Sequence, residues 1–181
     1  MIRKRQRDLG RIAAALFAIG VLTSTAAPAW AGDGDESAKS GDVCWVNADT
    51  GYSACYANET ALHAAVLKQT GTVLVEEGSV AARGEVVALA SYIVARLYDG
   101  ASYTGTSMIV SSGSSTICVS GSVQAATMPA GWDNRVSSYH SYYGCQTRIH
   151  EDTNYNGLSQ TAADDGSLGT LNNETSSYKV Y

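Results

Sequence analysis

An internal repeat constrains the fold of this chain more than any other feature of its sequence. Residues 98–105 read YDGASYTG, and residues 150–157 read HEDTNYNG. Both segments begin with a ring and an acid, and both continue to a tyrosine that stands two residues before a glycine. The pattern predicts two folded hairpins, in each of which the first ring packs over the closing glycine, where a side chain would collide.

A second matched element follows each predicted hairpin. Residues 133–138 read DNRVSS and residues 172–177 read NNETSS, so each block has two Asn or Asp residues, two variable positions and two serines. The surrounding region, residues 91–181, is dense in Tyr, Ser, Thr, Gly and Asn and contains short alternating runs. That composition predicts short strands joined by tight turns.

The two blocks and their hairpins together resemble the signature of the microbial βγ-crystallins, and the resemblance covers residues 91–181. It implies a sandwich of two Greek-key motifs. Trp132, immediately before the first block, fits as an anchor in the core of that sandwich. The expected fold class is therefore all-β, with a βγ-crystallin-like sandwich preceded by a small disulfide hairpin and a short helix at residues 42–90.

The resemblance also implies two calcium sites, each built from one block and completed by a backbone carbonyl from the hairpin of the other half. The first site would use the side chain of Asn134, the carbonyl of Arg135 and the hydroxyl of Ser137. The carbonyl of Glu151 would complete it, and Asp133 would brace the loop. Ca²⁺ takes roughly six to eight oxygen ligands, which amide, hydroxyl, carbonyl and water oxygens can supply.

The second site is expected to have the same composition. It would use the side chain of Asn173, the carbonyl of Glu174 and the hydroxyl of Ser176. Asp99 would complete it, and Asn172 would brace the loop. The resemblance thus predicts calcium ions as the ligands of the chain, with a stabilising effect on the Greek-key domain.

Three departures from the family pattern predict weak calcium binding. His150 stands where Tyr, Phe or Trp is usual, Arg135 adds a positive charge beside one site, and the second position of both blocks is a neutral Asn. With few formal charges, the dissociation constants are expected on the order of 10⁻⁵ to 10⁻³ M. The alternative is that Asn, Asp and Ser occur here because they form turns, with calcium bound weakly or not at all.

The N-terminus predicts export. Five basic residues precede an apolar run at residues 12–22: Arg3, Lys4, Arg5, Arg7 and Arg11. A small-residue stretch then ends in an A-x-A pattern at Ala29 and Ala31. We therefore expect a signal peptide at residues 1–31, a polar tether at 32–41, and a secreted, extracellular chain with no membrane association after cleavage. An uncleaved anchor is disfavoured because the apolar run is far shorter than the roughly 20 residues that cross a bilayer.

The charge of the chain argues against a nucleic-acid partner. The formal net charge is -5, and five of the twelve Lys and Arg residues lie in the predicted signal peptide, so the exported chain is more acidic still. Nucleic-acid binding requires a basic surface.

Four cysteines lie beyond the predicted leader, and an even number in an exported chain favours two disulfides over metal-binding thiolates. Three pairings are possible. A hairpin that turns at Asp49 places Cys44 opposite Cys55, which leaves Cys118 to pair with Cys145. A zinc site is disfavoured because there is no C-x-x-C pair and the three histidines are scattered.

Residues 42–90 contain a well-signalled short helix. Asn58 can cap a helix that begins at Glu59, and Gly71 can end it. Residues 72–76 are expected to form a strand, whereas residues 85–90 fit either strand or helix. The sequons at residues 58–60 and 173–175 are explained as a cap and a turn. Whether this region is a subdomain or a propeptide that is removed after export is left open by the sequence.

The sequence also bears on three other functions: protease inhibition, catalysis and sugar binding. The long connection between the first hairpin and its block, which includes Cys118, would be stiffened by a disulfide, and a stiffened exposed loop suits an inhibitor of a secreted protease. The superfamily includes a metalloproteinase inhibitor, so inhibition is the alternative function. Catalysis is not expected, because the sequence has no G-x-S-x-G, H-E-x-x-H or phosphate-binding loop. A sugar-binding role has no supporting pattern.

Overall fold

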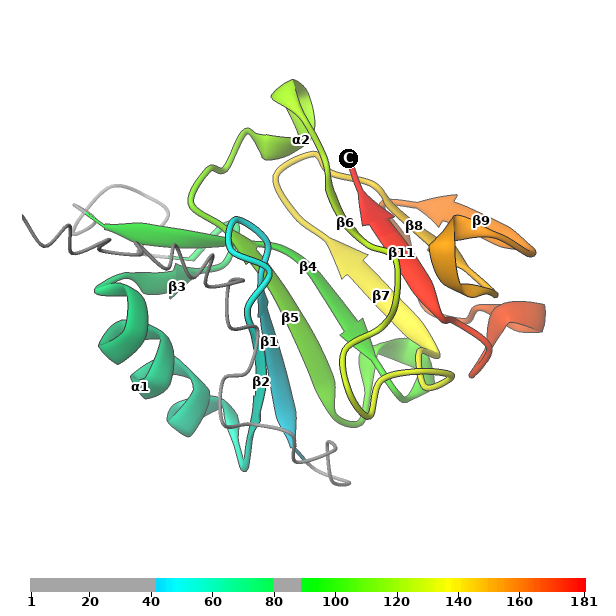
Figure 1. Ribbon diagram of the computed structural model, residues 1–181, viewed down its shortest axis with the longest axis horizontal. Helices are drawn as coiled ribbons and strands as arrows, with labels where there is room; N and C mark the ends of the chain where they lie inside the picture. The colour runs from blue at the N-terminus through cyan, green and yellow to red at the C-terminus, as the bar shows by residue number, and fades with distance from the viewer. Residues whose placement is uncertain (1–41, 80–88) are drawn as a thin grey trace, which may run out of the picture.

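The computed structural model describes residues 42–79 and 89–181 (Figure 1). The predicted signal peptide and tether lie outside these residues, as do residues 85–88 of the segment that fits strand or helix. Ala90, the last residue of that segment, begins a strand. No helix in the described ranges has the length and apolar character needed to span a membrane.

Two β-sheets form the body of the protein. The larger sheet has the strand order β10-β7-β4-β5-β1-β2, with β3 also paired to β4. Its strands are β1 (Val43–Asn47), β2 (Ser53–Tyr56), β3 (Val73–Val75), β4 (Ala90–Tyr98), β5 (Ser107–Ser112), β7 (Ser138–Ser141) and β10 (Asp164–Asp165). The smaller sheet has the order β6-β11-β8-β9, with strands β6 (Val123–Ala125), β8 (Thr147–His150), β9 (Ser159–Ala162) and β11 (Ser177–Val180).

The strand order contains two copies of one four-strand unit. In the first copy β4 and β5 form a hairpin and β7 returns to lie beside β4, while β6 crosses to the other sheet and pairs with β11. In the second copy β8 and β9 form the hairpin, β11 lies beside β8, and β10 crosses to pair with β7. This is a pair of Greek keys that exchange their third strands, and it confirms the predicted all-β fold class.

The N-terminal region extends the larger sheet at two places, beside β5 and beside the start of β4. β1 runs parallel to β5, and the first residues of β4 pair with β3. Helix α1 (Glu59–Thr70) connects β2 to β3 and begins and ends at the predicted caps, because the Asn58 side chain accepts from the amide of Ala61 and Gly71 adopts φ 69°. Without this region the edge of β5 would be exposed.

Both predicted disulfides are present. Cys44 and Cys55 are directly opposite in the β1–β2 register, with Cα atoms 4.0 Å apart. Cys118, in the short helix α2 (Ile117–Ser120), is bonded to Cys145, with Cα atoms 5.4 Å apart. The second bridge fixes the long connection between β5 and β6 to the turn before β8.

The two faces of the larger sheet bury separate clusters of apolar side chains. Along β1, Cys44 and Val46 belong to the cluster between the sheets, whereas Trp45 belongs to the cluster beneath α1. This alternation follows from the two-residue period of a strand. Trp132 is fully buried between the sheets, as expected of a core anchor. The result is three layers: helix α1, the larger sheet and the smaller sheet (Figure 1).

Candidate metal centre

The first repeated hairpin joins β4 to β5 through a short 3₁₀ turn, η2 (Ala101–Tyr103). The ring of Tyr98 packs edge-on against the ring of Tyr103, with centroids 5.9 Å apart. Gly105, at φ 83°, packs against the side chain of Asp99, and an added Cβ would collide with that carboxylate. A side chain is excluded at Gly105 as predicted, but the packing partner is the acid, and the first ring covers the second tyrosine instead.

The second hairpin, which joins β8 to β9 through η3 (Thr153–Tyr155), repeats this arrangement. The ring of His150 lies 5.8 Å from that of Tyr155. Gly157 has φ 72°, and an added Cβ there would lie 2.8 Å from the carboxylate of Asp152 and 2.9 Å from the Cβ of Glu151. In both hairpins the acid accepts a hydrogen bond from the amide seven residues later: Asp99 from Thr106 and Glu151 from Leu158.

The second serine of each block fastens the block to the hairpin of its own half. The hydroxyl of Ser138 donates to the carbonyl of Gly100 over 2.6 Å and accepts from the amide of Tyr103. The hydroxyl of Ser177 makes the same two bonds, to the carbonyl of Asp152 and from the amide of Tyr155. The last position of each block therefore needs a side chain that both donates and accepts a hydrogen bond, and serine provides one.

The second Asn of each block turns its loop through the left-handed region. Asn134 has φ 56° and Asn173 has φ 60°, a conformation that Asn adopts more readily than most residues. Their amides then cross between the halves. The amide of Asn134 donates to the carbonyl of Thr175, and the amide of Asn173 donates to the carbonyl of Val136. The two loops are therefore bonded to each other.

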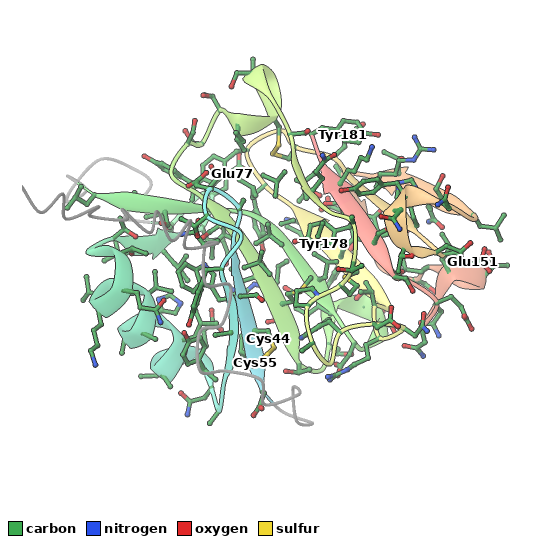
Figure 2. The ribbon with its side chains drawn as sticks, viewed as in Figure 1. Cys44, Cys55, Glu77, Glu151, Tyr178 and Tyr181 are labelled. Carbon is green, nitrogen blue, oxygen red and sulfur yellow. A yellow bond between two sulfur atoms is a disulfide. The ribbon has the colours of Figure 1, made fainter. Side chains whose placement is uncertain are left out.

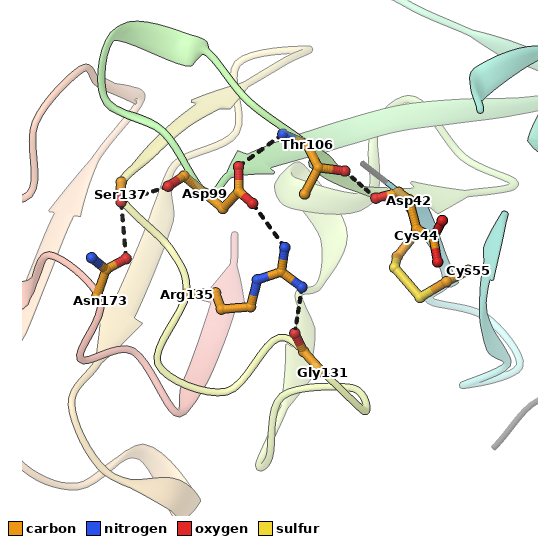
Figure 3. Close-up of polar contacts among 9 residues, drawn as sticks. All are labelled: Asp42, Cys44, Cys55, Asp99, Thr106, Gly131, Arg135, Ser137 and Asn173. Atoms are coloured by element: carbon orange, nitrogen blue, oxygen red, sulfur yellow. Dashed lines mark hydrogen bonds and ion pairs between the residues drawn. A yellow bond between two sulfur atoms is a disulfide. The ribbon is translucent and has the colours of Figure 1, made fainter. Parts of the chain in front are cut away.

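This crossing brings three oxygens together in one group, which we call the Ser137 cluster (Figure 3). The hydroxyl of Ser137 lies 3.0 Å from the carbonyl oxygen of Asp99 and 3.1 Å from the side-chain oxygen of Asn173. Ser137 has one hydroxyl proton and faces two acceptors, so it cannot donate a full hydrogen bond to both. A cation bound among these oxygens would interact favourably with all three.

A related group in the other half, which we call the Ser176 cluster, contains the Ser176 hydroxyl and the side-chain oxygen of Asn134. The hydroxyl of Ser176 lies 3.4 Å from the side-chain oxygen of Asn134. The amide of Ser176 donates to the carbonyl of His150, as the amide of Ser137 donates to that of Tyr98. Glu151 occupies the place in this half that Asp99 occupies in the first.

The structure groups the predicted ligands differently from the family resemblance. The resemblance implies one site with Ser137, Asn134 and Glu151. In the structure the hydroxyl of Ser137 lies with Asn173 and Asp99, and that of Ser176 lies with Asn134. The two serines are exchanged because each block stays bonded to its own hairpin, while its Asn reaches across to the other half.

The spacing of the oxygens suits calcium. Two oxygens 3.0 Å apart, each about 2.4 Å from an ion, subtend about 77° at the ion, close to the roughly 72° of a pentagonal-bipyramidal equator. The donor set is one carbonyl, one amide and one hydroxyl, all hard oxygen ligands. Within residues 42–79 and 89–181, no group of three or more His, Cys, Asp or Glu side chains could hold a metal ion. The residues present therefore fit a low-charge calcium site completed by backbone and water.

A carboxylate that is ion-paired with an arginine lies beside the Ser137 cluster. The guanidinium of Arg135 donates to the carboxylate of Asp99 over 2.8 Å and to the carbonyl of Gly131 over 2.8 Å (Figure 3). It also lies 5.1 Å from the ring centroid of Trp132. The positive charge that the sequence placed near a site is thus paired to Asp99 rather than free. It still reduces the attraction of this cluster for a cation.

The remaining predicted residues lie at the surface of the loops. Asp133, Asn172 and Glu174 are exposed. The side chain of His150 is 5% exposed, and burial, followed by the charges of Arg148 and Lys179, lowers its pKa. His150 is therefore neutral at pH 7 and fills the place of an aromatic ring as an uncharged side chain.

Comparison with known proteins gave similarity at the level of structure. No protein-family model and no curated protein sequence matched the chain. Among solved structures it is similar to a βγ-crystallin domain from Flavobacterium johnsoniae, with 20% identity over 49% of this chain and 93% of that chain and a TM-score of 0.34. It is also similar to a βγ-crystallin domain from Clostridium beijerinckii (16% identity, 49% and 97%, TM-score 0.37) and to the N-terminal domain of protein S (18%, 49% and 94%, 0.38).

Proposed function

We propose that this chain is an exported calcium-binding protein whose two oxygen clusters each take one Ca²⁺, and that the ions stabilise the Greek-key sandwich. The observation that carries the proposal is the convergence of the Ser137 hydroxyl, the Asp99 carbonyl and the Asn173 amide oxygen within 3.1 Å of the hydroxyl. The repeat of this arrangement at Ser176 and Asn134 supports a second site.

The bound ions would act as links between the two halves. The Ser137 cluster takes its serine and hairpin carbonyl from one half and its Asn from the other, and the Ser176 cluster likewise joins a serine of one half to an Asn of the other. An ion held by both therefore favours the folded state, because the unfolded chain does not bring these groups together. The proposal gives calcium a stabilising role and assigns no catalytic group.

Thermal unfolding of the exported chain tests this proposal. The unfolding temperature would be measured in chelator, in about 5 mM calcium and in about 5 mM magnesium. For a dissociation constant near 10⁻⁴ M, calcium should contribute about 2 kcal/mol per site, which corresponds to a rise of about 5 °C or more for a domain of this size. Magnesium should have little effect because it demands a tighter octahedral site. Equal unfolding temperatures in calcium and chelator would refute calcium binding.

A second candidate function is inhibition of a secreted protease. One observation favours it: Val119 is 85% exposed on helix α2, next to the Cys118–Cys145 bridge that fixes this segment to the core. An exposed apolar side chain on a fixed segment can serve as an anchor with little ordering cost. Stoichiometric inhibition of one member of a panel of secreted metalloproteases, lost in V119D, would support this function, and no inhibition across the panel would remove it.

A further inference from the structure

A shallow pocket on the first half of the sandwich is lined by rings and carboxylates. Its volume is about 490 Å³, and its lining residues are Glu76, Glu77, Tyr98, Tyr103, His140 and Tyr142. The two acids come from the turn after β3, and the rings come from β4, the first hairpin and the end of β7. The N-terminal region and the Greek-key region thus build this pocket together.

The rings of the pocket meet edge to face rather than in parallel stacks. Tyr98 and Tyr103 lie 5.9 Å apart at 68°, Tyr103 and His140 lie 5.9 Å apart at 87°, and His140 and Tyr142 lie 4.5 Å apart at 64°. Because the rings are steeply inclined to one another, their faces point in different directions around the pocket. Tyr103 is 42% exposed, so a ligand can reach its ring. The negative face of such a ring attracts a cation.

In the second half of the molecule, the tyrosine at the position of Tyr103 in the repeat is in contact with a positively charged side chain. Tyr155 is the counterpart of Tyr103, and Lys179 on β11 is the counterpart of His140 on β7. The ammonium of Lys179 lies 4.2 Å from the ring centroid of Tyr155. In the first half the strand carries His140 instead, whose Nδ1 is 2.5 Å from the carboxylate of Asp164. In the first half the counterpart of that ammonium group is therefore the His140 side chain, which lines the pocket and leaves the exposed ring of Tyr103 without an ammonium group of its own among the described lining residues.

The charges around the pocket favour a positive ligand. Neither Lys nor Arg is among its lining residues in the described part of the chain. Arg96 lies 3.4 Å from Glu76, but it also binds Glu59 over 2.8 Å, so one cation serves two carboxylates. The carboxylate of Glu77 accepts a hydrogen bond from the amide of Tyr143 (Glu77 is labelled in Figure 2).

We propose that this pocket binds an organic cation of the alkylammonium class, held against the face of Tyr103 and near the carboxylates of Glu76 and Glu77. The rings supply cation–π attraction, which is strongest for a cation with a weakly held hydration shell, such as a quaternary ammonium group. The acids supply charge complementarity. The site is independent of the calcium proposal, because none of its side chains belongs to either oxygen cluster.

Calorimetric titration with choline tests this site, with 3,3-dimethylbutan-1-ol as the uncharged molecule of the same shape. All titrations would contain saturating calcium, so that the oxygen clusters do not contribute. Choline should bind about tenfold more tightly than the alcohol. Equal affinities would overturn the proposal, as would the absence of choline binding or a preference for a neutral sugar.

Matched variants locate the site. Tyr103→Asn removes the ring and keeps a residue that tolerates the positive φ of 61° at this position, and it should weaken choline binding about tenfold. Tyr155→Asn makes the same change in the second half, where the ammonium of Lys179 lies over the face of the ring, and it should leave choline affinity unchanged.

Two further variants separate the ring from the charge. Tyr103→Phe should retain choline binding, because it keeps the ring. Glu77→Gln should weaken binding while its side-chain oxygen still accepts from Tyr143. Unchanged affinity in Tyr103→Asn would exclude this pocket.

Discussion

The hydroxyl of Ser137 lies 3.1 Å from the side-chain oxygen of Asn173, although 36 residues separate them in the chain. This contact crosses between the two Greek keys, and its counterpart joins Ser176 to Asn134. A cation held at either cluster would therefore report on the packing of the two halves against each other.

Paired substitutions distinguish the grouping of ligands in the structure from the grouping expected from the sequence. S137A with N173G removes two ligands of one cluster, so one calcium site should keep its full affinity. S137A with N134G removes one ligand from each cluster, so both sites should weaken. Glycine is used because both Asn residues have positive φ. Calcium titration by calorimetry measures the outcome, and one full-affinity site in S137A with N134G would contradict the structural grouping.

Replacing Arg135 should strengthen one calcium site. R135Q removes the positive charge that is bound to Asp99, so a cation at the Ser137 cluster no longer meets that positive charge beside it. The affinity of that site should rise by about threefold to tenfold at low salt and less at high salt. Calorimetry in two salt concentrations checks this. An affinity that is unchanged or lower would show that Arg135 acts on the site through the loop conformation and not through charge.

Gly105 should be intolerant of a side chain, whereas Gly144 provides a matched control. Both have positive φ, 83° and 71°, but an added Cβ at Gly105 collides with Asp99, and at Gly144 it meets nothing within 4 Å. G144A should lower the free energy of unfolding by about 1 kcal/mol, and G105A by roughly 3 kcal/mol or more, because strain and collision add. Urea unfolding in chelator measures both. Equal losses would show that the collision is relieved locally.

The pairing of Glu59 with Arg96 should make part of the stability dependent on pH. The hydrogen bond from Arg96 is the main cause that lowers the pKa of Glu59 below its usual value of 4.5. A lowered pKa contributes stability above about pH 4.5, and this contribution is lost as the pH falls through the folded-state value. Because the Glu59 side chain is 46% exposed, the effect should be under about 1 kcal/mol.

Urea unfolding of E59Q tests that dependence. The variant should be less stable than the unmodified chain at pH 7 by a few tenths of a kcal/mol, and the difference should vanish near pH 3. A difference of the same size at both pH values would assign the effect to packing or to helix capping instead of charge.

The two disulfides should contribute unequally to stability. Cys118 and Cys145 are 27 residues apart, and Cys44 and Cys55 are 11 apart. By chain entropy alone, C118A with C145A should lower the free energy of unfolding by about 3.6 kcal/mol, and C44A with C55A by about 2.8 kcal/mol. Urea unfolding measures both pairs. A larger loss from the shorter loop would show that the β1–β2 hairpin needs its bridge to pair with β5.

Short-range signals in the sequence predicted much of the fold. The cap residues Asn58 and Gly71 lie at the ends of α1, because a helix end is decided by the hydrogen bonds of a few neighbouring residues. Cys44 and Cys55 face each other because the turn between them fixes the register. The spacing of rings, acids and glycines likewise predicted two hairpins that exclude a side chain at Gly105.

The sequence did not predict how the first region joins the second. Residues 43–47 pair in parallel with β5, and nothing in their sequence indicates this, because the pattern of a strand does not specify which other strand it pairs with. The pocket beside Tyr103 was also missed, since its acids and its rings come from segments more than 20 residues apart. The mismatch of Lys179 and His140 in the aligned repeat was the available signal.

The sequence by itself determined the local elements of this protein, the two repeated units, and the oxygen-bearing residues that each unit supplies. Only the tertiary structure decided which serine shares a cluster with which Asn. The physical reason is that Ser138 and Ser177 fix each block to its own hairpin, while Asn134 and Asn173 turn through positive φ and reach the opposite half. Such a crossing is set by the packing of one Greek key on the other, which no spacing within a single block encodes.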